Sequence, residues 1–264
     1  MGMTIELPDD VPPEVAELGE PIAEFRSGAL AYVLFLVIGC FAILLGVGFL
    51  VLFIVILVMP ARANQGGRLP NFRTLIVAFV CVSAGIATLR RAWGLRGLHV
   101  IVFPVGLARI QGPQVDVLRW DDINRVTRNP SVKAKGLTLS TPTELILSSR
   151  DGREIVFNEN LSRLREMREL VEGNTLKVML PPAMEALEAD ETIGFGPVSV
   201  SAEGVHCGEQ TLPWAGYESA EIAQGNLLVK ATGARRPFCK APLAEVPNVH
   251  VLIALAERMA GRRS

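Results

Sequence analysis

The stretch from Ser27 to Ala61 reads SGALAYVLFLVIGCFAILLGVGFLVLFIVILVMPA and contains no charged residue. A helix needs about 20 apolar residues to cross the hydrocarbon core of a bilayer, and this run is longer. Its composition favours insertion into a membrane by on the order of 5 to 10 kcal/mol. The sequence therefore predicts a membrane-spanning helix over residues 28–59, ended by Pro60.

A second apolar run extends from Thr74 to Leu89 and is bracketed by Arg73 and by Arg90-Arg91. It is shorter than the usual span, so an interfacial or re-entrant helix is the alternative. The run has no polar face, and arginines at both ends can reach the head groups, which favours a second span over 73–92. Residues 28–95 are then a helical hairpin with both ends on one side of the membrane.

Small residues predict where the two helices touch. Gly39 and Gly46 lie one heptad apart on the first helix, which allows a close helix–helix contact on that side. The arginines around the two runs are expected to contact lipid head groups weakly. These residues are Arg62, Arg68, Arg73, Arg90, Arg91 and Arg96.

Charge is distributed unevenly along the 264 residues, although the net charge is only −1. Residues 1–27 hold several prolines and acidic side chains with Arg26 as the one basic residue, which predicts a disordered acidic tail. An acidic tail before so long an apolar run argues against a cleavable signal peptide. After Val100 the charges nearly balance, which argues against nucleic acid as a partner.

The pattern becomes β-like after the second apolar run. Residues 98–175 predict strands with an Asp151-Gly152 hairpin turn, closed by a helix over Leu161–Val171. Residues 193–262 repeat this order, so that the strand at Leu145 matches the one at Leu227, 82 residues later (227 − 145). The same shift pairs Leu164 with Val246 in the helices. Residues 176–192, which include Pro181-Pro182, are expected to be a linker.

Four features carry a family resemblance: Gly106-Leu107, Leu118-Arg-Trp-Asp-Asp-Ile123, the Asp151-Gly152 hairpin and the Leu161–Val171 helix. Together they resemble the pleckstrin-homology-like (PH-like) domains of bacterial membrane proteins. The resemblance implies a curved, antiparallel, seven-stranded sheet closed by one C-terminal helix, beside one or two transmembrane helices. It implies no activity. The expected fold class is a membrane α-helical hairpin followed by two tandem β-rich PH-like domains.

No residue set in the sequence predicts catalytic, metal-binding or cofactor-binding chemistry. Trp120 and Trp214 occupy the same place in each half and are expected in the two cores rather than on a ligand platform. Cys207 and Cys239 have no metal-type spacing, and we expect reduced, buried thiols rather than a disulfide framework. Inositol-lipid recognition is not expected, because the first hairpin offers Arg109 alone.

These observations predict a non-enzymatic integral membrane protein that presents tandem PH-like domains for protein or lipid interaction. The alternatives are a membrane-bound enzyme with a site between the two β-domains, and a structural subunit of a membrane complex. The expected location is the cytoplasmic (inner) membrane, as a multi-pass protein with its soluble domains in the cytoplasm. The lipid bilayer is the expected partner; the sequence identifies no protein partner and no oligomeric state.

Overall fold

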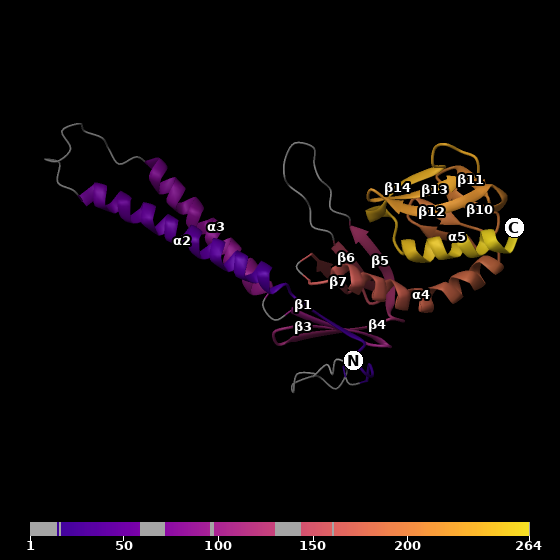
Figure 1. The fold of residues 1–264 in the computed structure, drawn as a ribbon, viewed down its shortest axis with the longest axis horizontal. Helices are drawn as coiled ribbons and strands as arrows, with labels where there is room; N and C mark the ends of the chain where they lie inside the picture. Colours follow the sequence, from indigo (N-terminus) through magenta and orange to yellow (C-terminus); the bar gives the residue numbers. More distant parts are fainter. Residues whose placement is uncertain are drawn as a thin grey trace. The chain divides into compact units, whose positions relative to one another are not determined.

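The structure is a computed structural model that describes residues 15, 17–58, 72–95, 98–129, 144–159 and 161–263. The chain divides into two compact units, shown in Figure 1. One unit consists of Arg26–His99 and Ile110–Gln114, and the other consists of Met1–Phe25, Val100–Arg109 and Val115–Ser264.

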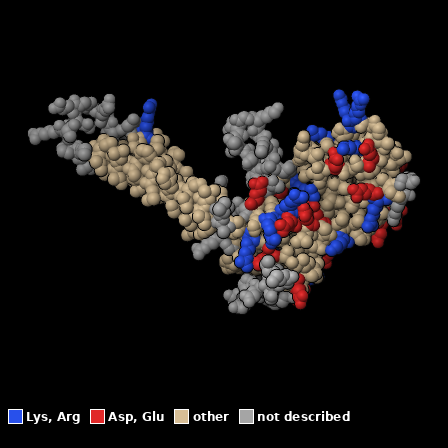
Figure 2. Space-filling model, viewed as in Figure 1, with Lys and Arg blue, Asp and Glu red and all other residues tan. Residues whose placement is uncertain are grey.

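The first unit is dominated by two long apolar helices, α2 (Ala29–Val58) and α3 (Phe72–Leu95). At 1.5 Å per residue they are about 45 and 36 Å long, against a hydrocarbon core of about 30 Å. Within them Tyr32–Ile56 and Arg73–Arg90 are long and apolar enough to cross a membrane. Figure 2 shows almost no charge on the visible face of this helix pair, whereas the β-rich unit carries interspersed acidic and basic side chains.

Glycines let the two helices approach closely. A Cβ atom added to Gly39 would lie 3.2 Å from the carbonyl oxygen of Gly85, and one added to Gly46 would lie 2.9 Å from that of Ala78. Any larger residue at these positions would push the helices apart. The predicted contact along the Gly39–Gly46 face is therefore confirmed.

The first β segment contains two antiparallel sheets. One has the strand order β1-β2-β3-β4 and the other β5-β6-β7. The strands are β1 (Ala23–Arg26), β2 (Leu98–Val102), β3 (Gly106–Gln111), β4 (Gln114–Arg119), β5 (Ile123–Asn129), β6 (Glu144–Ser149) and β7 (Glu154–Asn158). The predicted Asp151-Gly152 hairpin is confirmed as the β6–β7 turn, where Gly152 takes a φ of 86°.

Strand β1 corrects the prediction that residues 1–27 are a disordered tail. The backbone N–H of Ile22 donates to Val102 O at 2.8 Å, and that of Ser27 donates to Leu98 O at 3.0 Å. Phe25 and Leu18 are each 1% exposed, so this part of the tail contributes to a hydrophobic core despite its acidic neighbours. Residues 1–14 and 16 lie outside the described residues.

Helix α4 (Leu164–Glu188) corrects the predicted linker at 176–192. The helix continues through Pro181 and Pro182, whose exposed rings replace amide N–H groups on the outer side. Leu180, Met184 and Leu187 are buried at helical spacing in the core of the second β segment. Burial of this apolar face outweighs the two prolines, so one helix contributes to both β segments.

The second β segment also contains two antiparallel sheets, with orders β8-β9-β10-β11 and β12-β13-β14, and helix α5 packed on them. The elements are β8 (Ile193–Phe195), β9 (Val198–Val200), β10 (Gly204–Cys207), β11 (Gln210–Pro213), η2 (Trp214–Gly216), β12 (Tyr217–Ala223), β13 (Asn226–Ala231), β14 (Cys239–Pro242), η3 (Leu243–Glu245) and α5 (Val249–Arg263). Val198, Val229 and Leu252 are fully shielded in its core.

Candidate functional site

The two β segments meet where Asn248 binds the free edge of β5. The N–H of Asn248 donates to Val126 O at 2.8 Å, and Val126 N–H donates to the Asn248 Oδ1 at 2.7 Å. The side-chain amide of Asn248 also donates to Asn124 O at 2.9 Å. Asn248 has a φ of 52°, a conformation that asparagine tolerates better than most residues. It therefore satisfies backbone groups that an edge strand would leave unpaired.

Helices α4 and α5 are joined nearby through Thr175 and His250. The Thr175 hydroxyl donates to Val171 O at 2.8 Å, so its oxygen accepts from His250 Nε2 at 3.0 Å. This leaves the His250 Nδ1 as a buried acceptor for which the described part of the chain offers no hydrogen-bond partner. Burial, followed by the charge of Arg128, lowers the pKa of His250 from 6.5 to about 4. The imidazole is therefore neutral at pH 7.

Arg128 on β5 forms a bidentate ion pair with Glu172 on α4. Both side chains are largely buried, with 16% and 12% of their surfaces exposed. The fork geometry uses both carboxylate oxygens of Glu172. This pair fixes the first part of α4 to the edge of the β5-β6-β7 sheet.

A cavity of about 350 Å³ lies beside this ion pair, between the two β segments. Arg128 and the β6 residues Glu144 and Leu145 form one wall, and Leu164 and Arg168 of α4 form another. The second β segment closes it with side chains and backbone from β12, the β12–β13 turn and η3. Those lining residues are Ile222, Gly225 and Leu243. The lining thus combines two guanidinium groups and one carboxylate with an apolar remainder.

Arg168 is the unusual member of this lining. Its Nε is shielded from solvent and has no hydrogen-bond partner among the residues that the structure describes. Glu172, one turn further along α4, is already engaged by Arg128. Glu144 Oε2 accepts from Asn129 Nδ2 at 3.3 Å. The cavity therefore contains a positive group whose donor capacity is not fully used.

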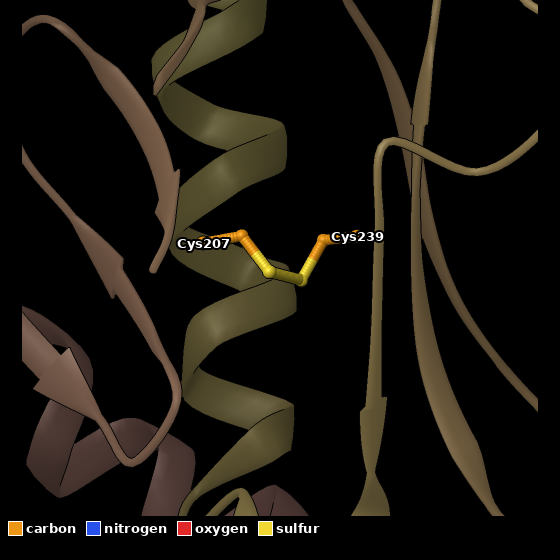
Figure 3. Close-up of a disulfide and its surroundings, with 2 residues drawn as sticks. All are labelled: Cys207 and Cys239. Atoms are coloured by element: carbon orange, nitrogen blue, oxygen red, sulfur yellow. A yellow bond between two sulfur atoms is a disulfide. The ribbon is translucent and has the colours of Figure 1, made fainter. Parts of the chain in front are cut away.

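A disulfide between Cys207 and Cys239 contradicts the expectation of reduced thiols. The two Cα atoms are 6.0 Å apart, and the bridge joins β10 of one sheet to β14 of the other, as Figure 3 shows. This pairing could not be predicted from the sequence, because 32 residues separate the cysteines and only the packing of the two sheets brings them together. Cys40 and Cys81, in α2 and α3, are free thiols.

The two tryptophans singled out by the sequence lie in the interior. Trp120 is 3% exposed and donates from Nε1 to Phe103 O at 3.2 Å. Trp214 is 4% exposed and donates to Ser201 O, also at 3.2 Å. Each indole thus fills a core and donates to an equivalent turn, the β2–β3 turn for Trp120 and the β9–β10 turn for Trp214.

The six arginines expected at lipid head groups are only partly visible. Arg73 and Arg90 lie on α3 with exposed side chains, at the two ends of its apolar stretch. Arg91 belongs to the same helix. Arg62, Arg68 and Arg96 lie outside the described residues. Among the residues that the structure describes, no three His, Cys, Asp or Glu side chains gather as metal ligands.

Comparison with known proteins adds a family. The model of a family of unknown function, DUF6585, matches residues 12–263, which include both long helices and both β segments. The chain belongs to DUF6585. No curated protein and no solved structure matches this member of the family.

The residues that sequence reasoning missed are those that join the two β segments. Asn248 and Val126 are 122 positions apart, and Thr175 and His250 are 75 apart. No local sequence pattern predicts these pairs, because each residue type is common in the helix, strand or turn that contains it. The one usable signal was the asparagine directly before the last helix, since asparagine favours such end positions and their unusual backbone angles.

Proposed function

We propose that this protein is a non-enzymatic integral membrane protein whose two-helix hairpin anchors two tandem PH-like domains that bind a protein or lipid at the membrane surface. The pairing of β1 with β2 is the observation that carries this proposal. The helices α2 and α3 are inserted between two neighbouring strands of one sheet. In the chain, the anchor is thus an insertion between two paired strands.

This pairing also supports the membrane topology. Ser27, just before α2, and Leu98, just after α3, are joined by a backbone hydrogen bond of 3.0 Å. Two helices that cross a bilayer and have their outer ends joined in this way must start and finish on the same side. We therefore propose that the shorter second run also crosses the bilayer, with Arg73 and Arg90 at its ends.

The element order supports the PH-like interpretation. Each β segment has four strands, then three strands, then a helix, which agrees with the resemblance in strand number and in the closing helix, although the strands form two sheets rather than one. A Cβ on Gly106 would lie 2.4 Å from Leu118 O, and one on Gly204 would lie 2.1 Å from Leu212 O. The same close approach of a β strand to its neighbour therefore requires glycine in both halves.

The repeat has a different register in its helices from the one predicted. Strands β6 and β13 begin at Glu144 and Asn226, 82 positions apart (226 − 144), as expected. Helices α4 and α5 begin at Leu164 and Val249, 85 positions apart (249 − 164). The predicted match of Leu164 with Val246 is therefore wrong by three residues, because seven residues connect β13 to β14 (232–238) where four connect β6 to β7 (150–153).

The disulfide argues against the predicted cytoplasmic location of the two β segments. Disulfides persist in oxidising compartments and are rare in the cytoplasm. We therefore propose that both β segments lie on the non-cytoplasmic side of the cytoplasmic membrane, instead of in the cytoplasm. Single cysteines at positions 10, 66 and 260, in a chain otherwise free of exposed thiols, test this: a membrane-impermeant maleimide on intact cells should label 10 and 260 but not 66.

The binding role is tested with a photo-crosslinking residue at Gln210, an exposed position on β11 at the edge of its sheet. Lys177, exposed on α4, is the matched control. We expect a protein or lipid adduct in native membranes from position 210 that is absent from position 177. Equal yields at both positions contradict the binding role, and extraction of the full chain by alkaline carbonate contradicts the anchor.

A further inference from the structure

We propose that the cavity between the two β segments binds a small amphiphile with one anionic head group, a monocarboxylate on a short apolar chain, and that Arg168 binds the carboxylate. This site requires neither the PH-like fold nor a particular side of the membrane. It is therefore independent of the proposed function above.

The positive charge of Arg168 is the first argument. Removing a charged group from water is costly unless a partner compensates it. Among the described residues the Nε of Arg168 has no hydrogen-bond partner, and Glu172, one turn further along α4, is already paired with Arg128. Arg168 helps to line the cavity, so an anion there balances its charge, and a planar carboxylate fits the guanidinium fork.

The local potential supports an anion. The charge of Arg128 contributes to the low pKa of His250, although Arg128 is itself paired with Glu172. Glu144 stands on the same cavity wall and limits the net positive charge. Two guanidinium groups and one carboxylate line the cavity, a formal net charge of +1 (2 − 1), which favours a monoanion over a doubly charged phosphate monoester.

The remaining walls and the volume define the rest of the ligand. Leu145, Leu164, Ile222 and Leu243 make most of the lining apolar. Pockets for small ligands measure about 300–1,000 Å³ and combine apolar walls with a few placed polar groups. At about 350 Å³ this cavity is at the small end of that range, so it suits a chain of medium length and not a whole lipid.

The test uses the full-length protein in phosphatidylcholine nanodiscs and measures binding of radiolabelled octanoate, with empty nanodiscs subtracted. We expect saturable binding at one site per chain. Octanol, which lacks the charge, and octyl phosphate, which carries more of it, should each bind at least tenfold more weakly. Stronger binding of octyl phosphate than of octanoate overturns the carboxylate assignment, and equal binding of octanol overturns the role of charge.

The variant Arg168→Gln should weaken octanoate binding at least tenfold. Its thermal midpoint should not fall below that of the wild type, because it removes an uncompensated charge, and this shows that it is folded. Arg165→Gln, on the exposed side of α4 and paired with Glu169, is the matched control and should change binding less than twofold. Leu164→Trp should reduce binding by filling the cavity while Arg168 is kept. Unchanged binding in Arg168→Gln, or no saturable octanoate binding in the wild type, overturns the proposal.

Discussion

Asn248 hydrogen-bonds with Val126 much as a neighbouring β strand would, with one bond of 2.8 Å from its own N–H and one of 2.7 Å to its Oδ1. The two residues belong to different β segments, so this pair fixes the start of α5 to the edge of β5. Hydrogen exchange of the Val126 N–H measures the stability of this contact directly, because that N–H exchanges with solvent only when the contact opens.

Replacing Asn248 separates two contributions to this contact. Asn248→Gly keeps the φ of 52° but loses two side-chain hydrogen bonds, which should destabilise the contact by about 2 kcal/mol. Asn248→Ala loses the same bonds and adds about 1–2 kcal/mol of backbone strain. Hydrogen exchange of the peptide containing Val126, measured on the full chain in nanodiscs, should rank wild type, Gly and Ala in order of increasing exchange. Equal exchange in all three contradicts the contact.

Acid should destabilise the junction of α4 and α5 through His250. Its pKa is about 4 in the folded chain and 6.5 as a free side chain, so the unfolded state binds the proton first as the pH falls. Stability is therefore unaffected by this group above pH 6.5 and falls between pH 6.5 and 4, by about 3 kcal/mol in total. The thermal midpoint of the full chain at pH 7 and at pH 4.5 measures this loss.

The control for this pH dependence is His250→Gln, which can still donate to Thr175 but does not titrate. It should show a smaller drop in midpoint between the same two pH values. If wild type and variant lose stability equally, the acid sensitivity comes from other groups.

Excising the membrane hairpin should leave a folded, soluble protein. Because Ser27 and Leu98 are hydrogen-bonded neighbours, an Asn-Gly turn can replace residues 28–97 between β1 and β2. The fragment 98–264, in contrast, lacks β1 and the buried Phe25 and Leu18, which are worth about 2 kcal/mol or more each. The hairpin-free protein should show a sharp thermal transition, and the fragment should aggregate or unfold at a lower temperature. A fragment as stable as the hairpin-free protein would mean that β1 contributes nothing.

The disulfide should stabilise the second β segment. Closing a loop with a sequence separation of 32 residues restricts the unfolded chain by about 3–4 kcal/mol. Reduction, or the double variant Cys207→Ser with Cys239→Ser, should lower the thermal midpoint and increase exchange in β10 and β14. Chain isolated from native membranes under alkylating conditions should carry modified Cys40 and Cys81 alone. Alkylation of all four cysteines would contradict both the bridge and the proposed side.

Local signals explain what the sequence predicted well. The helices α2 and α3 follow from apolar length, and the β6–β7 turn follows from Asp151-Gly152, since neither needs distant partners. Strand β1 was missed because its partner β2 lies beyond the whole hairpin. The continuation of α4 was missed because Pro181-Pro182 suggested a break, and burial of Leu180 and Met184 overcame them. Arg168 and Asn248 become informative only when tertiary packing brings their surroundings together.

The shared helix α4 changes what the two tryptophans should do. Truncation of a buried aromatic residue to alanine costs about 3–5 kcal/mol. Two domains separated by a flexible linker would lose stability independently. Truncation of Trp120 would then leave the second β segment folded, and truncation of Trp214 would leave the first β segment folded. Met167 and Val171 are buried near one end of α4, and Leu180, Met184 and Leu187 towards the other. Damage to either core therefore loosens a helix that the other core also needs.

We accordingly expect Trp214→Ala to increase hydrogen exchange most in β9, β10 and β11, and also in the first turns of α4, around Met167. Trp120→Ala should act most on β2, β3 and β4, and also on the end of α4, around Leu187. Trp93→Ala is the control, because this side chain on α3 is 73% exposed and its loss should alter neither region. Exchange mass spectrometry of the full chain in nanodiscs resolves these peptides. If Trp214→Ala leaves the first turns of α4 as protected as in the wild type, the two β segments are energetically independent in spite of their common helix.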